Sequence, residues 1–159
     1  MYQIKESNSD HPDFKLLVKE LDADLKIRDG EEHAFYAHLN ATAILNHVVI
    51  LYHDTIPVGC GALRPINEQQ VEIKRMFVAP AFRRKGIASM MLAALEKSAA
   101  QLGYSSCILE TGKNQPEAIA LYLKAQFQII PNYGHYKDVA NSVCFEKVLS
   151  STNNEPISQ

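Results

Sequence analysis

The sequence predicts one mixed α/β domain, with a mostly antiparallel central sheet of about six to seven strands flanked by about four helices. The order of the periodic segments carries this prediction: strand patterns that form consecutive hairpins come first, and a strand–helix–strand crossover follows. Composition agrees, because 159 residues with 47% hydrophobic and 21% charged side chains suit one globular domain with its own core. We expect residues 1–150 to form the domain and 151–159 a polar tail.

The N-terminal part begins with the weakly alternating "MYQIKE", which predicts a first strand. The segment 10–27 predicts a helix with Asp10 as N-cap and Pro12 in the first turn. Its apolar residues recur at helical spacing: Phe14, Leu17, Val18, Leu21 and Leu25. A shorter helix is expected over 30–40.

Three strands in a meander come next: "AILNHVVILY", "PVGCGALRPI" after the turn "HDTI", and "QVEIKRMFVAP", which Pro80 stops. Strict alternation along the third strand divides its side chains between two faces. One face is expected to carry Glu72, Lys74, Met76 and Val78, and the other Val71, Ile73, Arg75 and Phe77.

The C-terminal half predicts a helix over 86–102, a strand "SSCILET", a helix "QPEAIALYLKA" and two closing strands, "FQIIP" and "NSVCFEKVL". Gly103 supplies the stop of the first helix. The core-facing side of this helix is expected to carry Ile87, Met91, Ala94, Leu95, Ser98 and Leu102.

Several classes of function are disfavoured by charge and spacing. A formal net charge of −2 argues against nucleic-acid binding, and no apolar run is long enough to span a bilayer, so we expect a cytoplasmic protein without a membrane partner. No metal is expected, because neither the histidines nor the cysteines have metal-ligand spacing. Cys60, Cys107 and Cys144 lie in apolar runs and are expected in the core.

The densest positive charge is the turn "RRKG" at residues 83–86, directly before the helix that starts near Ile87. A helix N-terminus is the wrong end for cations, but a bound anion among them reverses the sign of the interaction. Gly86 permits close approach of a ligand, and the small Ala88 and Ser89 keep that approach open. The turn therefore predicts a phosphate site, the alternative being a solvated charge run.

These residues resemble the GNAT superfamily of acyl-CoA-dependent N-acyltransferases, of the small single-domain bacterial type. Arg83-x-x-Gly86-x-Ala88 matches its pyrophosphate-binding signature. Similar stretches are "VEIKRMFVAPAFRRKGIASMML", "ETGKNQPEAIALYLKAQF", "VGCGAL" and "NSVCFEKVL", and together they cover roughly residues 43–149. The resemblance implies a GNAT-like fold and acetyl-CoA as acyl donor. It implies donor contacts at Phe77, Val78, Arg83, Arg84, Lys85, Gly86, Ile87, Ala88, Ser89, Asn114 and Gln115.

Two positions depart from the family pattern. Gln115 stands where the family often has asparagine, with Asn114 one position earlier, which leaves the contact to the pantetheine arm open. Gln126 replaces a family glycine, so we expect it to adopt a left-handed backbone at a cost of about 1 kcal/mol.

The resemblance implies acetyl transfer to a primary amine of a small molecule or peptide, by direct attack in a ternary complex. The alternative is a catalytically silent acyl-CoA-binding regulatory module. Tyr122 is the candidate acid for the leaving thiolate, or else a core tyrosine. Glu72 is the candidate base, or else a cross-strand ion-pair partner of Lys74 or Arg75, with water taking the proton.

The same resemblance places the oxyanion donor at a backbone N–H around Phe77 or Val78, where the central strand is expected to splay from its neighbour. It also places the loop around His135 near the acceptor. A homodimer is common in the family and stays an expectation here.

Overall fold

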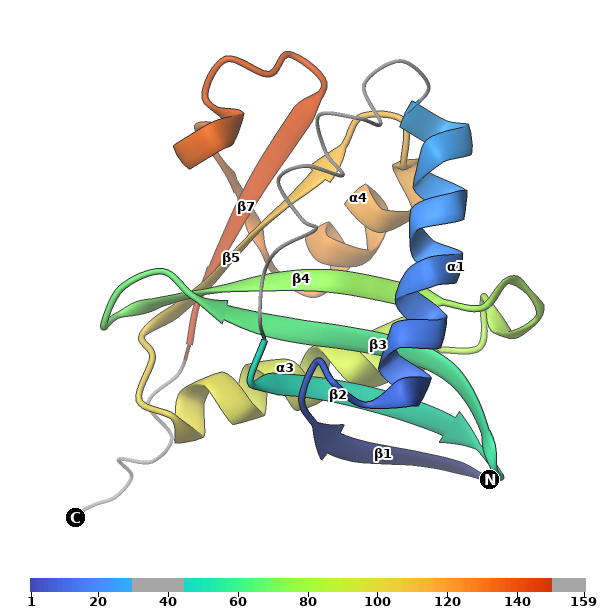
Figure 1. Ribbon diagram of the computed structural model, residues 1–159. Helices are drawn as coiled ribbons and strands as arrows, with labels where there is room; N and C mark the ends of the chain where they lie inside the picture. The colour runs from blue at the N-terminus through green and yellow to red at the C-terminus, as the bar shows by residue number, and fades with distance from the viewer. Residues whose placement is uncertain (30–44, 150–159) are drawn as a thin grey trace.

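The structure, a computed structural model, describes residues 1–29 and 45–149 and has the mixed α/β fold that the sequence predicts (Figure 1). In chain order the elements are β1 (Tyr2–Ser7), α1 (Pro12–Asp29), β2 (His47–His53), β3 (Ile56–Pro65), β4 (Gln70–Val78), α3 (Ile87–Gln101), β5 (Ser106–Gly112), α4 (Pro116–Lys124), β6 (Gln128–Ile130) and β7 (Ser142–Val148). Two 3-10 turns, Pro80–Phe82 and Gly134–Tyr136, join them. The helix expected over 30–40 and the tail 151–159 lie outside the described residues.

A seven-stranded sheet runs through the molecule in the order β1-β2-β3-β4-β5-β7-β6. Neighbouring strands are antiparallel except β4 and β5, which pair in parallel. Parallel strands need a crossover, and α3 provides it. The sheet is therefore antiparallel on both sides of one parallel seam, and that seam positions the site.

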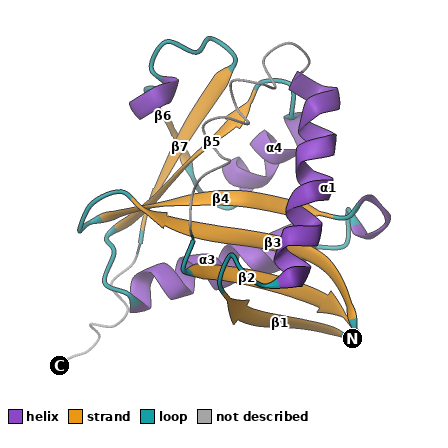
Figure 2. Ribbon diagram, in the orientation of Figure 1, coloured by secondary structure: helices purple, strands orange, loops and turns teal. Residues whose placement is uncertain are grey.

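The two faces of the sheet are covered by different helices, as Figure 2 shows. On one face Phe14, Leu17 and Leu21 of α1 pack over β2, β3 and the end of β4. On the other face α3 and α4 bury a larger cluster that includes Met91, Leu92 and Leu95. All three cysteines are buried, as predicted.

Some local expectations need correction. His11, not Asp10, caps α1, since its Nδ1 accepts a hydrogen bond from the Asp13 N–H at 3.1 Å. On α3 the buried stripe is shifted, with Leu92 and Ala99 inside and Leu102 47% exposed. The left-handed backbone expected at Gln126 is confirmed by its φ of 73°.

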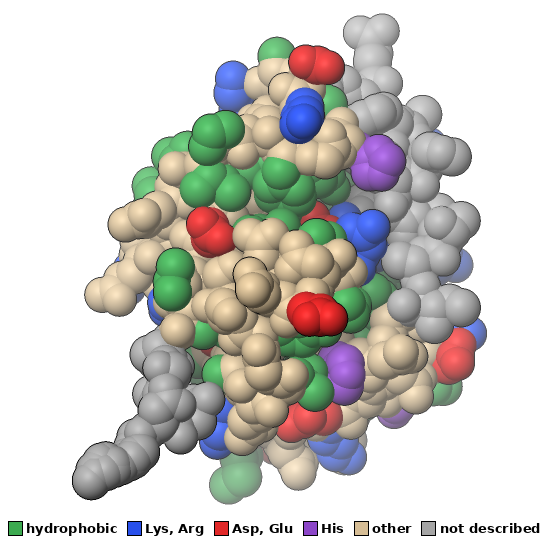
Figure 3. Space-filling view, turned by 90° about the vertical axis from the view of Figure 1, so that its left-hand side faces the viewer, with side chains coloured by type: hydrophobic (Ala, Val, Ile, Leu, Met, Phe, Trp, Pro, Cys, Tyr) green, Lys and Arg blue, Asp and Glu red, His purple; other side chains and the backbone are tan. Residues whose placement is uncertain are grey.

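The described surface carries mixed charge. On the side shown in Figure 3, Lys and Arg side chains lie at separate places beside acidic ones. Within the described ranges, no helix is both long and apolar enough to cross a bilayer.

Candidate functional site

β4 contains a bulge at the site. Lys74 pairs with Ala62 and Phe77 with Cys60, so the step from 74 to 77 on β4 matches only the step from 60 to 62 on β3. Arg75 takes up the extra length with a φ of 62°, a conformation that costs a side-chain-bearing residue about 1–2 kcal/mol.

Gly61 makes room for this bulge. A Cβ at Gly61 would lie 2.7 Å from the Met76 Sδ and 2.8 Å from the Leu95 Cδ1. The bulge also overturns the strict alternation predicted for β4. Phe77 packs with the α1 cluster, on the opposite face from Val71 and Ile73.

β4 and β5 separate after Glu72, just before the bulge is reached. They pair only over Gln70–Glu72 and Ser106–Ile108, so the splay implied by the family resemblance is present (Figure 1). The Ala79 N–H donates to the Val58 carbonyl at 2.8 Å, and N–H groups alternate in direction along a strand. The Val78 N–H therefore points away from β3, toward the opening.

The cationic turn divides its charges between protein and solvent. Arg83 Nε donates to the Val78 carbonyl at 2.8 Å, and its Nη2 lies 3.4 Å from Asp24. Arg84 and Lys85 are exposed. Gly86 caps α3 with φ 81° and no side-chain hydrogen bond, and the first bond of the helix runs from the Met90 N–H to the Gly86 carbonyl. The N–H groups of Ile87, Ala88 and Ser89 therefore precede the first helical bond, the arrangement that binds anions.

A cleft of about 570 Å³ extends from this turn along the opening between β4 and α4. The sequence-predicted donor residues that line it are Phe77, Val78, Arg83, Arg84, Gly86, Ile87, Ala88, Ser89 and Gln115. Lys85 and Asn114, also predicted, are not among its lining residues. We call this space the donor cleft.

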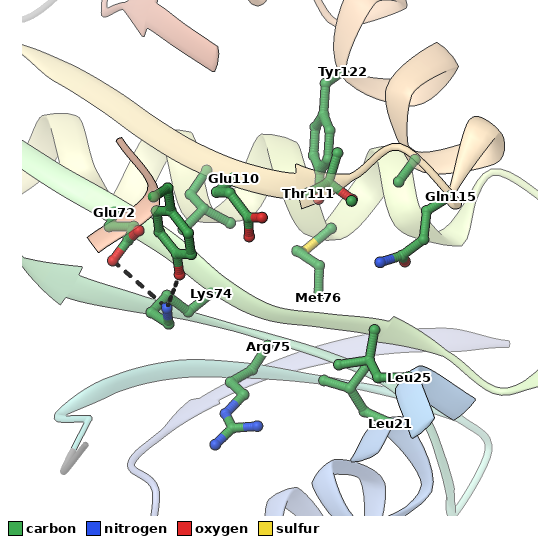
Figure 4. Close-up of a pocket in the computed structure, with 14 residues that line it drawn as sticks. Leu21, Leu25, Glu72, Lys74, Arg75, Met76, Glu110, Thr111, Gln115 and Tyr122 are labelled. Atoms are coloured by element: carbon green, nitrogen blue, oxygen red, sulfur yellow. Dashed lines mark hydrogen bonds and ion pairs between the residues drawn. The ribbon is translucent and has the colours of Figure 1, made fainter. Parts of the chain in front are cut away.

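A second, smaller pocket of about 110 Å³ lies deeper in the opening, with polar walls formed by Glu72, Lys74, Arg75, Glu110, Thr111 and Tyr136 (Figure 4). We call it the deep pocket. It shares Leu21, Met76, Gln115, Ala118 and Tyr122 with the donor cleft. Because Leu21 comes from α1 and Tyr122 from α4, the splayed strands join spaces that a closed sheet would keep apart.

Tyr122 stands where the two spaces meet. Its ring packs edge-on to Phe127, with centroids 5.8 Å apart, and tilted to Phe145 at 5.6 Å. Burial, and then the charge of Glu110, raise the pKa of Tyr122 well above its usual value. Within the described residues its hydroxyl makes no hydrogen bond. The phenol is thus protonated near neutrality and has its donor available to a ligand.

Glu72 is only 1% exposed, and both of its carboxylate oxygens are engaged. Oε1 accepts a hydrogen bond from Arg64 Nη1 at 2.9 Å, and Oε2 accepts one from the Tyr133 hydroxyl at 2.6 Å. Lys74 Nζ lies 3.8 Å from Oε1. Of the ion pairs considered from the sequence, the one with Lys74 is present, whereas Arg75 binds Asp22 at 3.1 Å.

Sequence reasoning missed several residues of this network. Arg64 could have been found, because it is the cross-strand neighbour of Glu72 in a hairpin whose turn is visible in the sequence. The loop around His135 does reach the site, but through Tyr133 and Tyr136, while His135 itself is exposed. Glu110 was passed over because one carboxylate inside a strand has no distinguishing pattern.

The deep pocket also contains a buried lysine. Lys74 donates to the Tyr136 hydroxyl at 3.2 Å. Burial lowers the pKa of Lys74, and the nearby Glu72 opposes that effect. Across the opening, Glu110 Oε2 accepts a hydrogen bond from the Ser142 hydroxyl at 2.6 Å. Among the described residues, no three His, Cys, Asp or Glu side chains gather as metal ligands.

Known acetyltransferases resemble this chain in sequence. The profile of the Acetyltransferase (GNAT) family matches residues 13–127. An IAA acetyltransferase of Azospirillum brasilense is 40% identical over 93 residues, which cover 58% of this chain and 61% of that protein. The uncharacterized N-acetyltransferase YsnE of Bacillus subtilis (strain 168) is 34% identical over 57% of this chain and 62% of its own length. The match therefore spans about three fifths of these curated relatives.

Solved structures show the same fold over almost the whole chain. A Klebsiella pneumoniae protein, provisionally assigned as an acyl-CoA N-acyltransferase, superposes with a TM-score of 0.79 at 30% identity, covering 94% of this chain and 99% of that one. A GNAT family acetyltransferase from Elizabethkingia anophelis, solved with acetyl-CoA bound, gives a TM-score of 0.68 at 19% identity, covering 93% and 98%.

Proposed function

The chain belongs to the GNAT family of acetyltransferases, and on this premise we propose that it transfers an acetyl group from acetyl-CoA to a primary amine of a small molecule or peptide. One observation carries the proposal: a long cleft at an uncapped helix N-terminus and a polar pocket meet at the Tyr122 side chain. The first space suits a nucleotide thioester and the second an acceptor. Their junction would hold both reactants in one ternary complex.

Donor binding would start at the turn before α3. The diphosphate would accept hydrogen bonds from the N–H groups of residues 86–89, with Arg84 and Lys85 adding positive charge nearby. Gly86 supports close approach, because no atom lies within 4 Å of the position that a Cβ would occupy there. Gln115 lines the path of the pantetheine arm, and Asn114 stays a predicted contact.

The chemistry then needs three groups. A neutral amine would attack the thioester carbon, forming the C–N bond, and the C–S bond would break as the tetrahedral intermediate collapses. The N–H of Val78 faces the opening and suits the oxyanion. The Tyr122 hydroxyl would donate its proton to the thiolate and regain the single proton that the nitrogen loses as the amide forms, so that the transfer step itself releases no proton. The one proton released overall leaves earlier, when the ammonium form of the acceptor becomes the neutral amine.

Glu72 as the base stays a prediction from the sequence. Its contacts favour the alternative, because Arg64 and Tyr133 already occupy both of its carboxylate oxygens. In that case water would accept the ammonium proton, and Glu72 would hold the walls of the pocket in place.

The test uses the purified chain with acetyl-CoA and a panel of amino acids, polyamines, aminoglycosides and short peptides. We expect free thiol to appear only when an acceptor is present, and calorimetry to detect acetyl-CoA binding without one. Binding with no amine-dependent release of thiol from any member of the panel would favour the regulatory module. A cytoplasmic location and a homodimer stay predictions.

A further inference from the structure

Val78 presents two polar backbone groups to the opening of the sheet. The Ala79 N–H donates to the Val58 carbonyl of β3 at 2.8 Å, and the C=O of a trans peptide points opposite to its N–H. The Val78 carbonyl therefore points away from β3, on the same side as the Val78 N–H. Since β4 pairs with β5 only over Gln70–Glu72, no described strand binds either group on that side.

Arg83 binds the first of these groups, the carbonyl. Its Nε donates to the Val78 carbonyl at 2.8 Å, and its Nη2 lies 3.4 Å from Asp24 of α1. The Cζ of Arg83 also lies 5.5 Å from the centroid of the Phe77 ring, within the range of a cation–π contact. These three contacts fix the guanidinium between β4 and α1, with its positive charge beside the strand.

This placement differs from that of the other two cations of the turn. Arg84 and Lys85 are exposed, whereas Arg83 is half-buried and two of its nitrogens already have partners in the protein. The helix N-terminus that suits a diphosphate begins at Gly86. A cation that is bound to the preceding strand therefore serves that strand more directly than it serves the phosphates.

We propose that Arg83 is a positioning residue for the oxyanion donor and not a ligand of the diphosphate. This inference rests on the proposed function and deepens it. An unbound carbonyl next to the Val78 N–H would direct its negative end at the site where the oxyanion develops, and would oppose its formation. Arg83 binds that carbonyl, holds the peptide in one orientation and adds positive charge on the side where negative charge develops.

The infrared band of the bound thioester carbonyl reports the oxyanion donor and needs no acceptor. The probe is acetyl-CoA carrying an isotope label at that carbonyl, because a hydrogen bond from the Val78 N–H lowers its stretching frequency. In Arg83→Met we expect the band to move to higher frequency. Acetyl-CoA affinity, measured by calorimetry, should stay within about threefold of wild type.

The rate of transfer should change although donor affinity does not. With the amine that the panel identifies, single-turnover transfer at saturating acetyl-CoA should fall by roughly 10- to 100-fold in Arg83→Met. That is less than the 10²–10³-fold typical of removing an oxyanion donor itself. A residue that only stabilised the fold would lower the melting temperature and move neither the band nor the rate of the folded protein.

A second substitution at the same position keeps the charge. In Arg83→Lys the compact ammonium lacks the planar fork that joins the Val78 carbonyl to Asp24. It should therefore recover only part of the band position and of the rate. This variant also provides the test if Arg83→Met melts early.

Two further variants serve as controls. Lys147 also combines an ion pair, to Glu96 at 2.7 Å, with an aromatic ring, that of Phe127 at 5.9 Å, but it lines neither space. Lys147→Met should therefore keep both the band and the rate. Arg84→Met removes an exposed cation from the same turn and should weaken acetyl-CoA binding more than Arg83→Met does, with the band where the wild type has it.

The outcomes separate the two proposals. A loss of affinity that is larger in Arg83→Met than in Arg84→Met, with the band unmoved, would make Arg83 a diphosphate ligand and overturn the positioning role. An unmoved band and an unchanged rate in both folded Arg83 variants would also overturn it and leave acetyl transfer standing. A wild-type protein that does not bind acetyl-CoA would overturn the proposed function and this inference with it.

Discussion

The two ends of the β4–β5 seam contain similar residues, a carboxylate bound by a serine hydroxyl, but have different roles. At one end, which we call the closed end, Gln70–Glu72 pairs with Ser106–Ile108, and Glu146 accepts hydrogen bonds from the Ser106 hydroxyl and the Gln70 amide. At the other end, which we call the open end, the strands have separated, and Glu110 accepts a hydrogen bond from the Ser142 hydroxyl beside a pocket.

Both carboxylates lie on one face of the sheet, because Glu146 is opposite Ile108 and Ser142 is opposite Gly112. Their local chemistry is nearly the same, a carboxylate fastened by a serine across β5 and β7. What differs is the neighbouring strand. Where β4 stays paired the carboxylate holds the sheet together, and where β4 has left β5 and carries the bulge at Arg75 the carboxylate lines a cavity. Changes at the open end should therefore affect catalysis, and changes at the closed end should affect stability.

The largest effect is expected for Tyr122→Phe at the open end. This variant keeps the ring contacts to Phe127 and Phe145 and removes only the hydroxyl. If that hydroxyl protonates the thiolate, the rate should fall by about 10²–10⁴-fold while acetyl-CoA affinity holds. Single-turnover acetyl transfer at saturating donor is the measurement. A rate within about threefold of wild type, roughly 0.6 kcal/mol, would make Tyr122 a packing residue and leave protonation to water.

The pH dependence of that step has a definite sign. Because burial raises the pKa of Tyr122, the phenol stays protonated from acid to neutral and mildly alkaline pH. Loss of activity at low pH would therefore come from protonation of the amine or its base and should be the same in Tyr122→Phe. A profile of kcat/KM against pH for both proteins measures this, and a limb that disappears in the variant would contradict it.

The next largest effect is expected for Gly86→Glu, at the mouth of the open end. The added carboxylate would stand beside the diphosphate, and we expect acetyl-CoA affinity to fall by at least about 100-fold, since like charges in contact cost several kcal/mol. Gly86→Asn is the matched control, because asparagine tolerates the left-handed φ of 81° without adding a charge. Calorimetry should show a clearly smaller loss of affinity for Asn, which adds bulk alone, than for Glu, which adds bulk and charge. Equal affinities in the two variants would move the diphosphate elsewhere.

Much of the fold was predictable because its signals are local. The helix from 87, the stop at Pro80 and the cationic turn are each specified by residues adjacent in sequence, and the donor cleft follows from them. The bulge was not predictable in this way. It depends on Gly61 of the neighbouring strand β3, where the missing side chain leaves space for Met76. No pattern within β4 indicates that contact.

The acceptor side was the least predictable part for the same reason. Glu72 was identified, but its partners Arg64 and Tyr133 come from another strand and from a distant loop. Glu110 can be identified as a site residue only from the separation of β4 and β5 in the structure. The phosphate turn of the donor cleft is thus encoded by one contiguous segment, whereas the deep pocket is assembled from four: α1, β4, the stretch from β5 to α4, and the turn that carries Tyr136.

Glu72 lies at the boundary between the two ends, and Glu72→Gln tests to which end it belongs. If it anchors the pocket, the free energy of unfolding should fall by about 2 kcal/mol, the worth of its charged hydrogen bonds, with acetyl-CoA affinity unchanged. Tyr133→Phe removes one of the same hydrogen bonds and should have a similar but smaller effect on both stability and rate. Chemical unfolding and single-turnover rates measure the pair. A rate loss of about 100-fold or more in Glu72→Gln alone would instead assign it as the base.

The smallest effect is expected at the closed end, where Glu146→Gln should leave acetyl transfer within about twofold of wild type and lower the free energy of unfolding by about 1 kcal/mol. The Ser106 hydroxyl and the Gln70 amide both donate to Oε2 of Glu146, so the carbonyl of the introduced glutamine can accept both bonds from that position. The expected loss comes from replacing a charged acceptor by a neutral one in a half-buried position, far from any reacting atom. The measurement pairs chemical unfolding with the transfer assay, using Glu110→Gln as the open-end counterpart. The two variants should show opposite profiles, with stability affected more in Glu146→Gln and catalysis more in Glu110→Gln. A loss of activity at Glu146 as large as that at Glu110 would mean that the seam acts as one unit and that the separation of the strands does not divide structure from function.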